Sequence, residues 1–203
     1  MLMPEVIITP DQEEELEIRD MYYDRDRVLQ LMKEKCYKKG EFTLSSGRKS
    51  EHYVNLKPCT LNGDALLFLS WCLYESIEED TVAVAGLTLG ADPLVAGVAM
   101  CGAIEERRLD GLIVRKEPKG HGTNAWIEGP PQPKGSKVTV LEDVTTTGGS
   151  SIKAALKLRE AGYTVDRIVT ILDRQVDDEA YINAEKNGID IVVLFKLEEL
   201  LDD

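Results

Sequence analysis

The residues best suited to chemistry lie near position 145, where an apolar run ends in two adjacent carboxylates, Glu142 and Asp143. A turn of small hydroxyl and glycine residues follows, and a helical pattern begins at Ile152. Such a turn presents backbone N–H groups and the positive end of a helix dipole, so it can bind a phosphate monoester without a lysine. The carboxylates could accept hydrogen bonds from sugar hydroxyls or balance developing positive charge. The turn consists of Val144, Thr145, Thr146, Thr147, Gly148, Gly149 and Ser150.

This turn matches neither of the two common glycine-rich phosphate motifs. It lacks the Gly-Lys-Ser/Thr of a Walker A loop and the Gly-x-Gly-x-x-Gly of a dinucleotide-binding loop. The alternative is an ordinary strand-to-helix turn capped by a threonine. Paired acids followed by three threonines at one strand end favour an anion-binding site over that alternative.

A second cluster is cationic. Arg115, Lys116, Lys119 and His121 place four potential cations within seven residues, opposed only by Glu117, and glycines stand on both sides of the histidine. A solvated basic loop is one interpretation. In a chain with 24 basic and 37 acidic residues, net charge −13, a lid that closes over a polyanion is the better one. Closure would bring positive charge to a leaving group and exclude water.

Two further segments follow apolar strands. Gly86–Pro93 contains two glycines and no cation, so its backbone N–H groups suit an oxyanion such as pyrophosphate, although glycines after strands are also common in ordinary turns. Arg174 follows a later strand, and its guanidinium could bind a carboxylate with two parallel hydrogen bonds. From the residues alone, an ion pair of Arg174 with Asp173 or Asp177 is equally compatible with the sequence.

The elements that must position these groups alternate between short apolar strands and helices. The helices are predicted around Val95, Ala154 and Ala184, between the strands. This alternation predicts an α/β fold, a doubly wound parallel sheet flanked by helices, with ligands bound beyond the carboxyl ends of the strands. The predicted strands are Val82–Ala85, Gly111–Val114, Lys137–Leu141, Arg167–Leu172 and Ile189–Leu194.

Before the sheet, the pattern predicts a small N-terminal hood. A helix through Val28 and Cys36 is expected to end at Gly40, followed by two short strands, Phe42–Leu44 and Tyr53–Leu56, and a helix from Asp64 to Glu78. Residues 1–26 hold nine acids and two arginines and are expected to be an acidic leader, either a solvated helix or an interaction tail. Residues 27–203 are expected to form a single domain that includes the hood.

Composition excludes several function classes. A net charge of −13 disfavours nucleic acid and anionic membrane partners. The weakly polar stretch 81–104 contains Asp92–Pro93 and four glycines, so it is predicted to be strand, loop and helix rather than a membrane span. With no Cys-x-x-Cys pair and only two histidines, no zinc site is predicted. We expect a cytoplasmic protein with reduced thiols, since the N-terminus lacks the features of a signal peptide.

The segment 138–151 resembles the signature with which type I phosphoribosyltransferases bind phosphoribosyl pyrophosphate (PRPP). Four other segments resemble the orotate phosphoribosyltransferase family in particular, and the resemblance spans most of the chain, from Phe42 to Arg174. They correspond to the substrate loop, the pyrophosphate loop, the mobile catalytic loop and a late substrate-binding strand end. These segments are Phe42–Ser50, Gly86–Pro93, Arg115–Gly122 and Leu172–Arg174.

The resemblance implies transfer of ribose 5-phosphate from PRPP to orotate, giving orotidine 5′-monophosphate and pyrophosphate in pyrimidine (UMP) biosynthesis. It implies Mg²⁺ held mainly by substrate oxygens and water, with no residue assigned as a metal ligand. It also implies a homodimer in which the lid reaches the partner's active site. The implied catalytic residues are Lys119, His121 and Asp143. The implied PRPP ligands are Arg115, Lys116, Lys119, His121, Glu142, Asp143 and the turn Val144–Ser150, and the implied orotate ligands are Thr146, Arg174, Tyr53 and Val54.

Two positions depart from the family pattern. Many members carry a lysine where this chain has Ser45, and some carry one where it has Gly90. Arg48 or Lys49 could compensate, or substrate binding could be weaker. A purine phosphoribosyltransferase is a second hypothesis, but a neutral purine gives the Arg174 guanidinium no carboxylate to bind. A PRPP-sensing regulator is a third, but it would normally carry a basic nucleic-acid-binding segment, and the leader is acidic.

Overall fold

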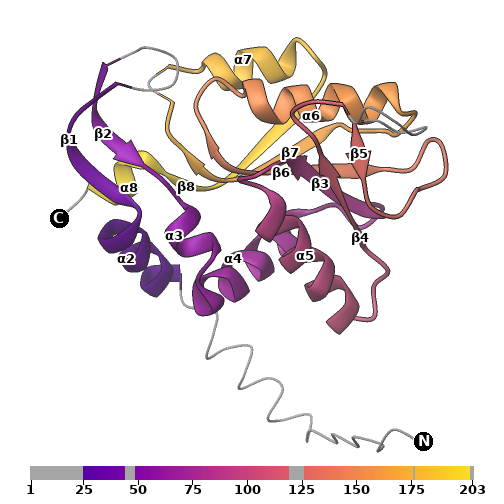
Figure 1. Cartoon of the computed structure of the whole chain (residues 1–203), viewed down its shortest axis with the longest axis horizontal. Coiled ribbons are helices and arrows are strands. Elements are labelled where there is room, and N and C mark those ends of the chain that lie inside the picture. Colours follow the sequence, from indigo (N-terminus) through magenta and orange to yellow (C-terminus); the bar gives the residue numbers. More distant parts are fainter. Residues whose placement is uncertain (1–24, 44–48, 119–125, 176, 202–203) are drawn as a thin grey trace, which may run out of the picture.

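A six-stranded sheet forms the centre of the computed structural model, which describes residues 25–43, 49–118, 126–175 and 177–201 (Figure 1). The strand order is β5-β4-β3-β6-β7-β8, and every neighbouring pair is parallel except β4 and β5. The predicted α/β fold with a parallel sheet is therefore confirmed, with a two-residue antiparallel strand added at one edge. The strands are β3 (Ala83–Leu87), β4 (Asp110–Val114), β5 (Ile127–Glu128), β6 (Val138–Thr145), β7 (Arg167–Asp173) and β8 (Asp190–Lys196).

Helices cover both faces of the sheet. Figure 1 shows α6 (Gly149–Glu160) and α7 (Glu179–Glu185) on one face, and α4 (Gly63–Ser76) and α5 (Asp92–Ile104) on the other. All five residues of β3 are buried, as expected for a central strand covered on both sides. Strand β4 lies on one side of β3, and β7 lies on the opposite side of β6. The direction in which successive strands are added to the sheet therefore reverses between β3 and β6. Loops at such a reversal leave a crevice at the carboxyl ends of the strands.

Strand β6 is longer than the sequence predicted. It was expected to end at Leu141, but it continues to Thr145, because β7 keeps pairing with it up to the Thr145–Asp173 position. Glu142 and Asp143 are therefore strand residues rather than the first residues of the following loop. Their backbones are held by the sheet, which fixes the two carboxylates more firmly than a loop would.

The N-terminal hood consists of a helix, a hairpin and one short helix. Helix α2 (Arg25–Lys35) is followed by the antiparallel strands β1 (Tyr37–Thr43) and β2 (Lys49–Val54) and by α3 (Lys57–Thr60). The expectation that Gly40 ends the first helix is wrong. The chain leaves the helix before Tyr37, and Gly40 lies inside β1 where the pairing register with β2 shifts, a usual place for glycine in a strand. The leader residues 1–24 lie outside the described residues.

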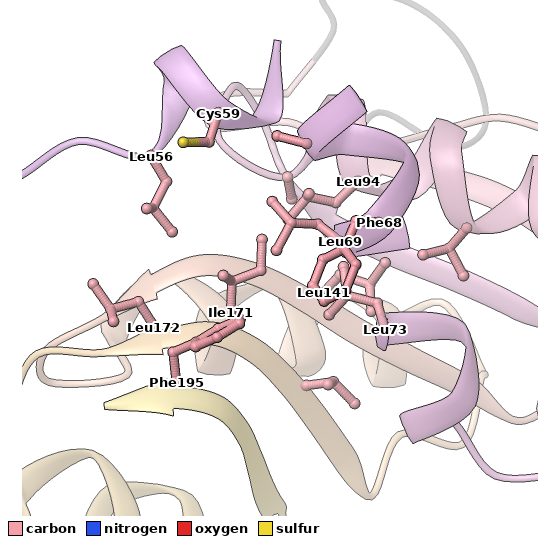
Figure 2. Close-up of a cluster of buried hydrophobic side chains, with 14 of the residues drawn as sticks. Leu56, Cys59, Phe68, Leu69, Leu73, Leu94, Leu141, Ile171, Leu172 and Phe195 are labelled. Carbon is pink, nitrogen blue, oxygen red and sulfur yellow. The ribbon is translucent and has the colours of Figure 1, made fainter. Parts of the chain in front are cut away.

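A continuous apolar core fastens the hood to the sheet. Figure 2 shows side chains of the hood, of α4 and α5 and of three strands packed together. The short C-terminal helix α8 (Leu197–Leu201) contributes Leu200 to the same core. The segment that joins β2 to α3 is thereby held beside the carboxyl end of β6. The side chains labelled in Figure 2 are Leu56, Cys59, Phe68, Leu69, Leu73, Leu94, Leu141, Ile171, Leu172 and Phe195.

A second core, on the opposite face of the sheet, packs α6 against β3, β4, β6 and β7. Leu158 of α6 and Ile168 of β7 are fully buried in it. Within the described ranges, no helix is long and apolar enough to cross a membrane. The two cores leave the carboxyl edge of the sheet as the place where polar side chains can gather.

Candidate active site

A cavity of about 340 Å³ lies at the carboxyl end of β6. Three segments that are far apart in the sequence line it: residues 53–57 of the hood, residues 142–151 of β6 and α6, and Arg174 after β7. The predicted phosphate turn, the paired carboxylates, Tyr53 and Val54 thus share one cavity. A hollow of similar size between α2 and α4 is lined by none of the catalytic or binding residues predicted from the sequence.

The turn between β6 and α6 leaves the helix N-terminus open. Gly148 is the N-cap residue, in the left-handed conformation (φ +72°), and it has no side chain with which to cap the helix. The alternative of a threonine cap is therefore wrong. Thr147 Oγ1 accepts only a long hydrogen bond of 3.4 Å from the Gly149 N–H, and Gly149 and Ser150 are exposed. This arrangement suits a phosphate monoester, which would receive the free N–H groups and the helix dipole.

Glu142 and Asp143 sit in different environments although they are neighbours. Glu142 is 7% exposed, and its Oε2 atom has no hydrogen-bond partner among the described residues. Burial and the neighbouring Asp143 raise the pKa of the Glu142 carboxyl well above its usual range. Asp143 is more accessible, and its Oδ1 accepts a hydrogen bond from the Val144 N–H at 2.9 Å. One buried carboxyl thus lacks a partner that a ligand hydroxyl could supply.

Arg174 lies at the cavity beside the predicted Thr146. Its backbone N–H donates to the Thr145 carbonyl at 2.9 Å, and its Nη2 donates to Thr146 Oγ1 at 3.2 Å. Burial lowers the pKa of the guanidinium from its ordinary value. Among the described residues no carboxylate lies within ion-pair distance of it, and Asp173 instead accepts a hydrogen bond from Tyr181 Oη at 2.8 Å. A half-buried guanidinium with no internal counter-ion is a suitable binding group for a ligand carboxylate.

Comparison with known proteins gives one consistent family. The chain is 48% identical over 176 residues to the orotate phosphoribosyltransferase of Thermosynechococcus vestitus, covering 87% of this chain and 92% of that protein. The chain belongs to the orotate phosphoribosyltransferase family. It is similar to the Mycobacterium tuberculosis member solved with Fe(III) dicitrate (TM-score 0.75, 32% identity, 87% of this chain and 98% of that one). The same protein solved with PRPP gives a TM-score of 0.71 at 30% identity, covering 88% of this chain and 99% of that one. No protein-family model matches the chain.

The segment Gly86–Pro93, which was predicted to bind pyrophosphate, approaches Asp143 of the carboxylate pair. A Cβ atom on Gly90 would lie 2.7 Å from Oδ1 of Asp143, closer than real Cβ atoms approach. Thr88 Oγ1 donates to Asp92 Oδ2 at 2.7 Å, which ties the loop to the first turn of α5. Any side chain at position 90 would therefore require the Asp143 carboxylate to move from its present position.

Lys57 is a site residue that sequence reasoning missed. Its Nζ lies 3.7 Å from Oδ2 of Asp143, and its backbone N–H donates to Asn55 Oδ1 at 3.2 Å where α3 begins. Lys57 and Asn55 both line the cavity. The available signal was a lysine directly after the predicted strand Tyr53–Leu56. Position 45, the other site of a missing family lysine, lies outside the described residues.

The described part of the lid does not line this cavity. Arg115 and Lys116 follow β4, which β3 separates from β6. Arg115 Nη1 forms an ion pair with Glu128 Oε1 of β5 at 3.1 Å, and Lys116 is exposed. Lys119 and His121 lie outside the described residues. Arg115 and Lys116, which the family resemblance assigns to pyrophosphate, thus follow β4, whereas the carboxylates assigned to ribose lie on β6.

Proposed function

We propose that this chain catalyses transfer of ribose 5-phosphate from PRPP to orotate, giving orotidine 5′-monophosphate and pyrophosphate for pyrimidine synthesis. The observation that carries this proposal is the meeting of three groups in one cavity. They are a helix N-terminus without a side-chain cap, a carboxylate pair with an unsatisfied oxygen, and an arginine that forms no ion pair with any described residue. These groups match the phosphate, the ribose hydroxyls and the orotate carboxylate, respectively.

The turn Thr145–Ser150 would hold the 5′-phosphate through its N–H groups and hydroxyls. Glu142 and Asp143 would accept hydrogen bonds from the ribose hydroxyls, which supplies the partner that Glu142 Oε2 lacks. N1 of orotate then attacks C1 of the ribose as the bond to pyrophosphate breaks, and positive charge develops on the ribose ring. A carboxylate held beside that ring stabilises the charge most in the transition state, which is how it would raise kcat.

We propose Mg²⁺ as the cofactor. Among the described residues no group of three or more Asp, Glu, His or Cys side chains is placed to hold a metal ion. Asp143 and Glu142 do offer the hard oxygen atoms that this ion prefers, so the residues fit a cation held mainly by substrate oxygens and water. When bound, the ion would neutralise charge on the pyrophosphate. Lys57 would add a cation on the protein side of the same region.

We further propose a cytoplasmic homodimer whose lids reach across to the partner's sites. Support for a shared site comes from the placement of Arg115 and Lys116 away from this chain's own cavity. The family resemblance assigns these residues, with Lys119 and His121, to pyrophosphate. A lid that serves the neighbouring chain would account for both facts.

The test is substrate choice. Consumption of orotate with PRPP, followed by ultraviolet absorbance with and without Mg²⁺, should show rapid turnover that requires the metal. Uracil lacks the carboxylate, so it would leave the Arg174 guanidinium unpaired. The kcat/KM for uracil should therefore be lower than that for orotate by a factor that corresponds to about 2–4 kcal/mol. Equal turnover of uracil or a purine would overturn the assignment.

A pair of arginine variants separates the role of Arg174 from a general effect of charge. Arg174→Ala should lose most of the preference for orotate over uracil. Arg167→Ala removes an arginine from the opposite end of the same strand, where it pairs with Glu78 and Asp190, and should keep that preference. If both variants discriminate like the wild type, Arg174 does not bind the orotate carboxylate.

A further inference from the structure

Two thiols lie against each other at the base of the hood. Sγ of Cys36 and Sγ of Cys59 are 2.8 Å apart, although the residues are 23 positions apart in the sequence. Cys36 follows α2 and Cys59 lies in α3, and their side chains are 2% and 0% exposed. A disulfide bond is about 2.05 Å long, so the two sulfur atoms need to approach by less than about 1 Å to be joined.

The backbone holds this pair in place from both sides. The Cys36 N–H donates to the Met32 carbonyl, its own carbonyl accepts from the Asn55 N–H, and both distances are 2.9 Å. The Cys59 N–H donates to the Leu56 carbonyl at 2.9 Å. Figure 2 shows the Cys59 sulfur close to Leu56 in the apolar core of the hood. These hydrogen bonds hold the backbones of both cysteines in place, and from these backbones the two side chains meet.

The pKa values of the two thiols are shifted in opposite directions. A hydrogen bond from Cys59 lowers the pKa of the Cys36 thiol, and the charge of Lys35 acts in the same direction. The same hydrogen bond and burial raise the pKa of the Cys59 thiol. Thiolates are the nucleophiles in sulfur chemistry, so Cys36 is suited to attack and Cys59 to attack second.

We propose that Cys36 and Cys59 form an oxidisable dithiol that a peroxide converts to a disulfide bond linking α2 to α3. In the first step the Cys36 thiolate attacks one peroxide oxygen, the O–O bond breaks, and sulfenic acid and hydroxide form. In the second step the Cys59 sulfur attacks the sulfenic sulfur and displaces hydroxide. With the two thiol protons, the products are one disulfide and two water molecules, and the thiols lose the two electrons that the peroxide gains.

The bond would close a loop around the hairpin of β1 and β2. That loop contains Tyr53, Val54 and Lys57, which line the proposed active-site cavity. A covalent closure of this length restricts the unfolded chain, so the oxidised protein should melt roughly 5–10 °C higher than the reduced one. Because both sulfur atoms are buried, oxidation should be slow and limited by local opening of the contact between α2 and α3.

The experiment oxidises the full chain with hydrogen peroxide at neutral pH and samples it over time. Each sample is denatured, alkylated and digested without a reductant, and disulfide-linked peptides are identified by mass spectrometry. Trypsin alone leaves Cys59, Cys72 and Cys101 in one peptide, because no cleavable lysine or arginine stands between Lys49 and Arg107. A second protease specific for acidic residues separates them at positions such as Asp64 and Glu75, neither of which is followed by proline.

We expect alkylation to fall from four cysteines to two, with one linked peptide that joins Cys36 to Cys59, and the higher melting temperature to revert with dithiothreitol. Cys36→Ser and Cys59→Ser should each abolish the link, whereas the control Cys72→Ser should retain it. Four alkylated cysteines after prolonged oxidation, single-cysteine oxidation without a bridge, or a bridge through Cys72 or Cys101 would each overturn the proposal. If the serine variants do not fold, the peptide map of the wild type decides alone, and none of these readouts depends on enzymatic activity.

Discussion

Glu142 is a buried residue with a carboxyl oxygen to which a bound ligand could donate a hydrogen bond. A buried carboxyl with one unpartnered oxygen destabilises the free protein, and a ribose hydroxyl at that atom would remove the penalty. The neighbouring Asp143 increases the effect, because two adjacent carboxylates resist being charged together. The penalty is therefore linked both to pH and to substrate.

The pH dependence of stability tests this reading of Glu142. Its native pKa is raised above the ordinary value of 4.5, so its contribution to stability is complete below about that pH and is lost as the pH rises through the native pKa. Glu142→Gln cannot ionise. The melting temperature of the wild type should therefore fall relative to that of Glu142→Gln as the pH is raised from 4 to 8, by thermal denaturation followed by circular dichroism. A constant difference across that range would contradict the raised pKa.

Gly90 provides a second prediction at the scale of one residue. In Gly90→Ala the new methyl group would lie 2.7 Å from the Asp143 carboxylate, which must move. Misplacement of a catalytic group by about 1 Å can lower the rate about 100-fold, so kcat should drop by at least about tenfold with little change in melting temperature. Gly63→Ala is the matched control, since no atom lies within 4 Å of its added Cβ and α4 begins there. Wild-type kcat for Gly90→Ala would show that the loop adapts freely.

At the scale of elements, the turn before α6 depends on one left-handed residue. Gly148 (φ +72°) and Gly135 (φ +82°) share this conformation, but only Gly148 lines the cavity. Alanine at either position should cost about 1–3 kcal/mol in backbone strain, and so lower the melting temperature by roughly 2–10 °C. Only Gly148→Ala should also raise the KM for PRPP, by roughly tenfold, in steady-state assays. An equal KM in both variants would remove the turn from phosphate binding.

The sequence predicted the elements well where one physical signal dominated. Apolar runs such as Arg167–Leu172 marked buried strands. The helix expected from Ile152 onward is present, but it begins three residues earlier, at Gly149, so Gly149 and Ser150 belong to α6 and not to the turn. The predictions failed where pairing with another strand determined the secondary structure. Gly40 looks like a helix terminator, yet pairing with β2 places it in a strand, and pairing with β7 lengthens β6.

The same distinction holds for the site. The carboxylate pair and the turn could be predicted because each carries its chemistry in a local pattern, whereas the residues around Arg174 left an ion pair with Asp173 or Asp177 equally open. The contacts of Lys57 and Gly90 with Asp143 could not, because they join three segments that only the folded sheet and hood bring together. The thiol pair was missed for the same reason, since 23 residues separate Cys36 from Cys59.

At the scale of the whole molecule, the shared-site proposal predicts complementation between subunits. Lys119→Ala and Asp143→Asn homodimers should each be nearly inactive, because every site carries one lesion. After subunit exchange, about half of the dimers are mixed, and each mixed dimer has one site with both lesions and one with neither. Activity should recover to about a quarter of the wild type, measured by orotate consumption. A mixture with proven exchange but no recovery would mean that each chain uses its own lid.

Because α2 of the hood packs against the C-terminal end of the chain, its packing cannot be completed until synthesis is nearly finished. Val28 and Met32 of α2 share their core with Phe195 and Leu200, and Arg25 forms a 2.6 Å ion pair with Glu199. Residues of α3 and α4 also pack against α2, so its apolar side is partly covered early and is completed only when the last strand and helix have been made. Synthesis proceeds at about 5–20 residues per second, so the part of this side that packs against α8 stays uncovered for many seconds on every nascent chain. Any factor that holds unfinished chains would find its binding surface on α2.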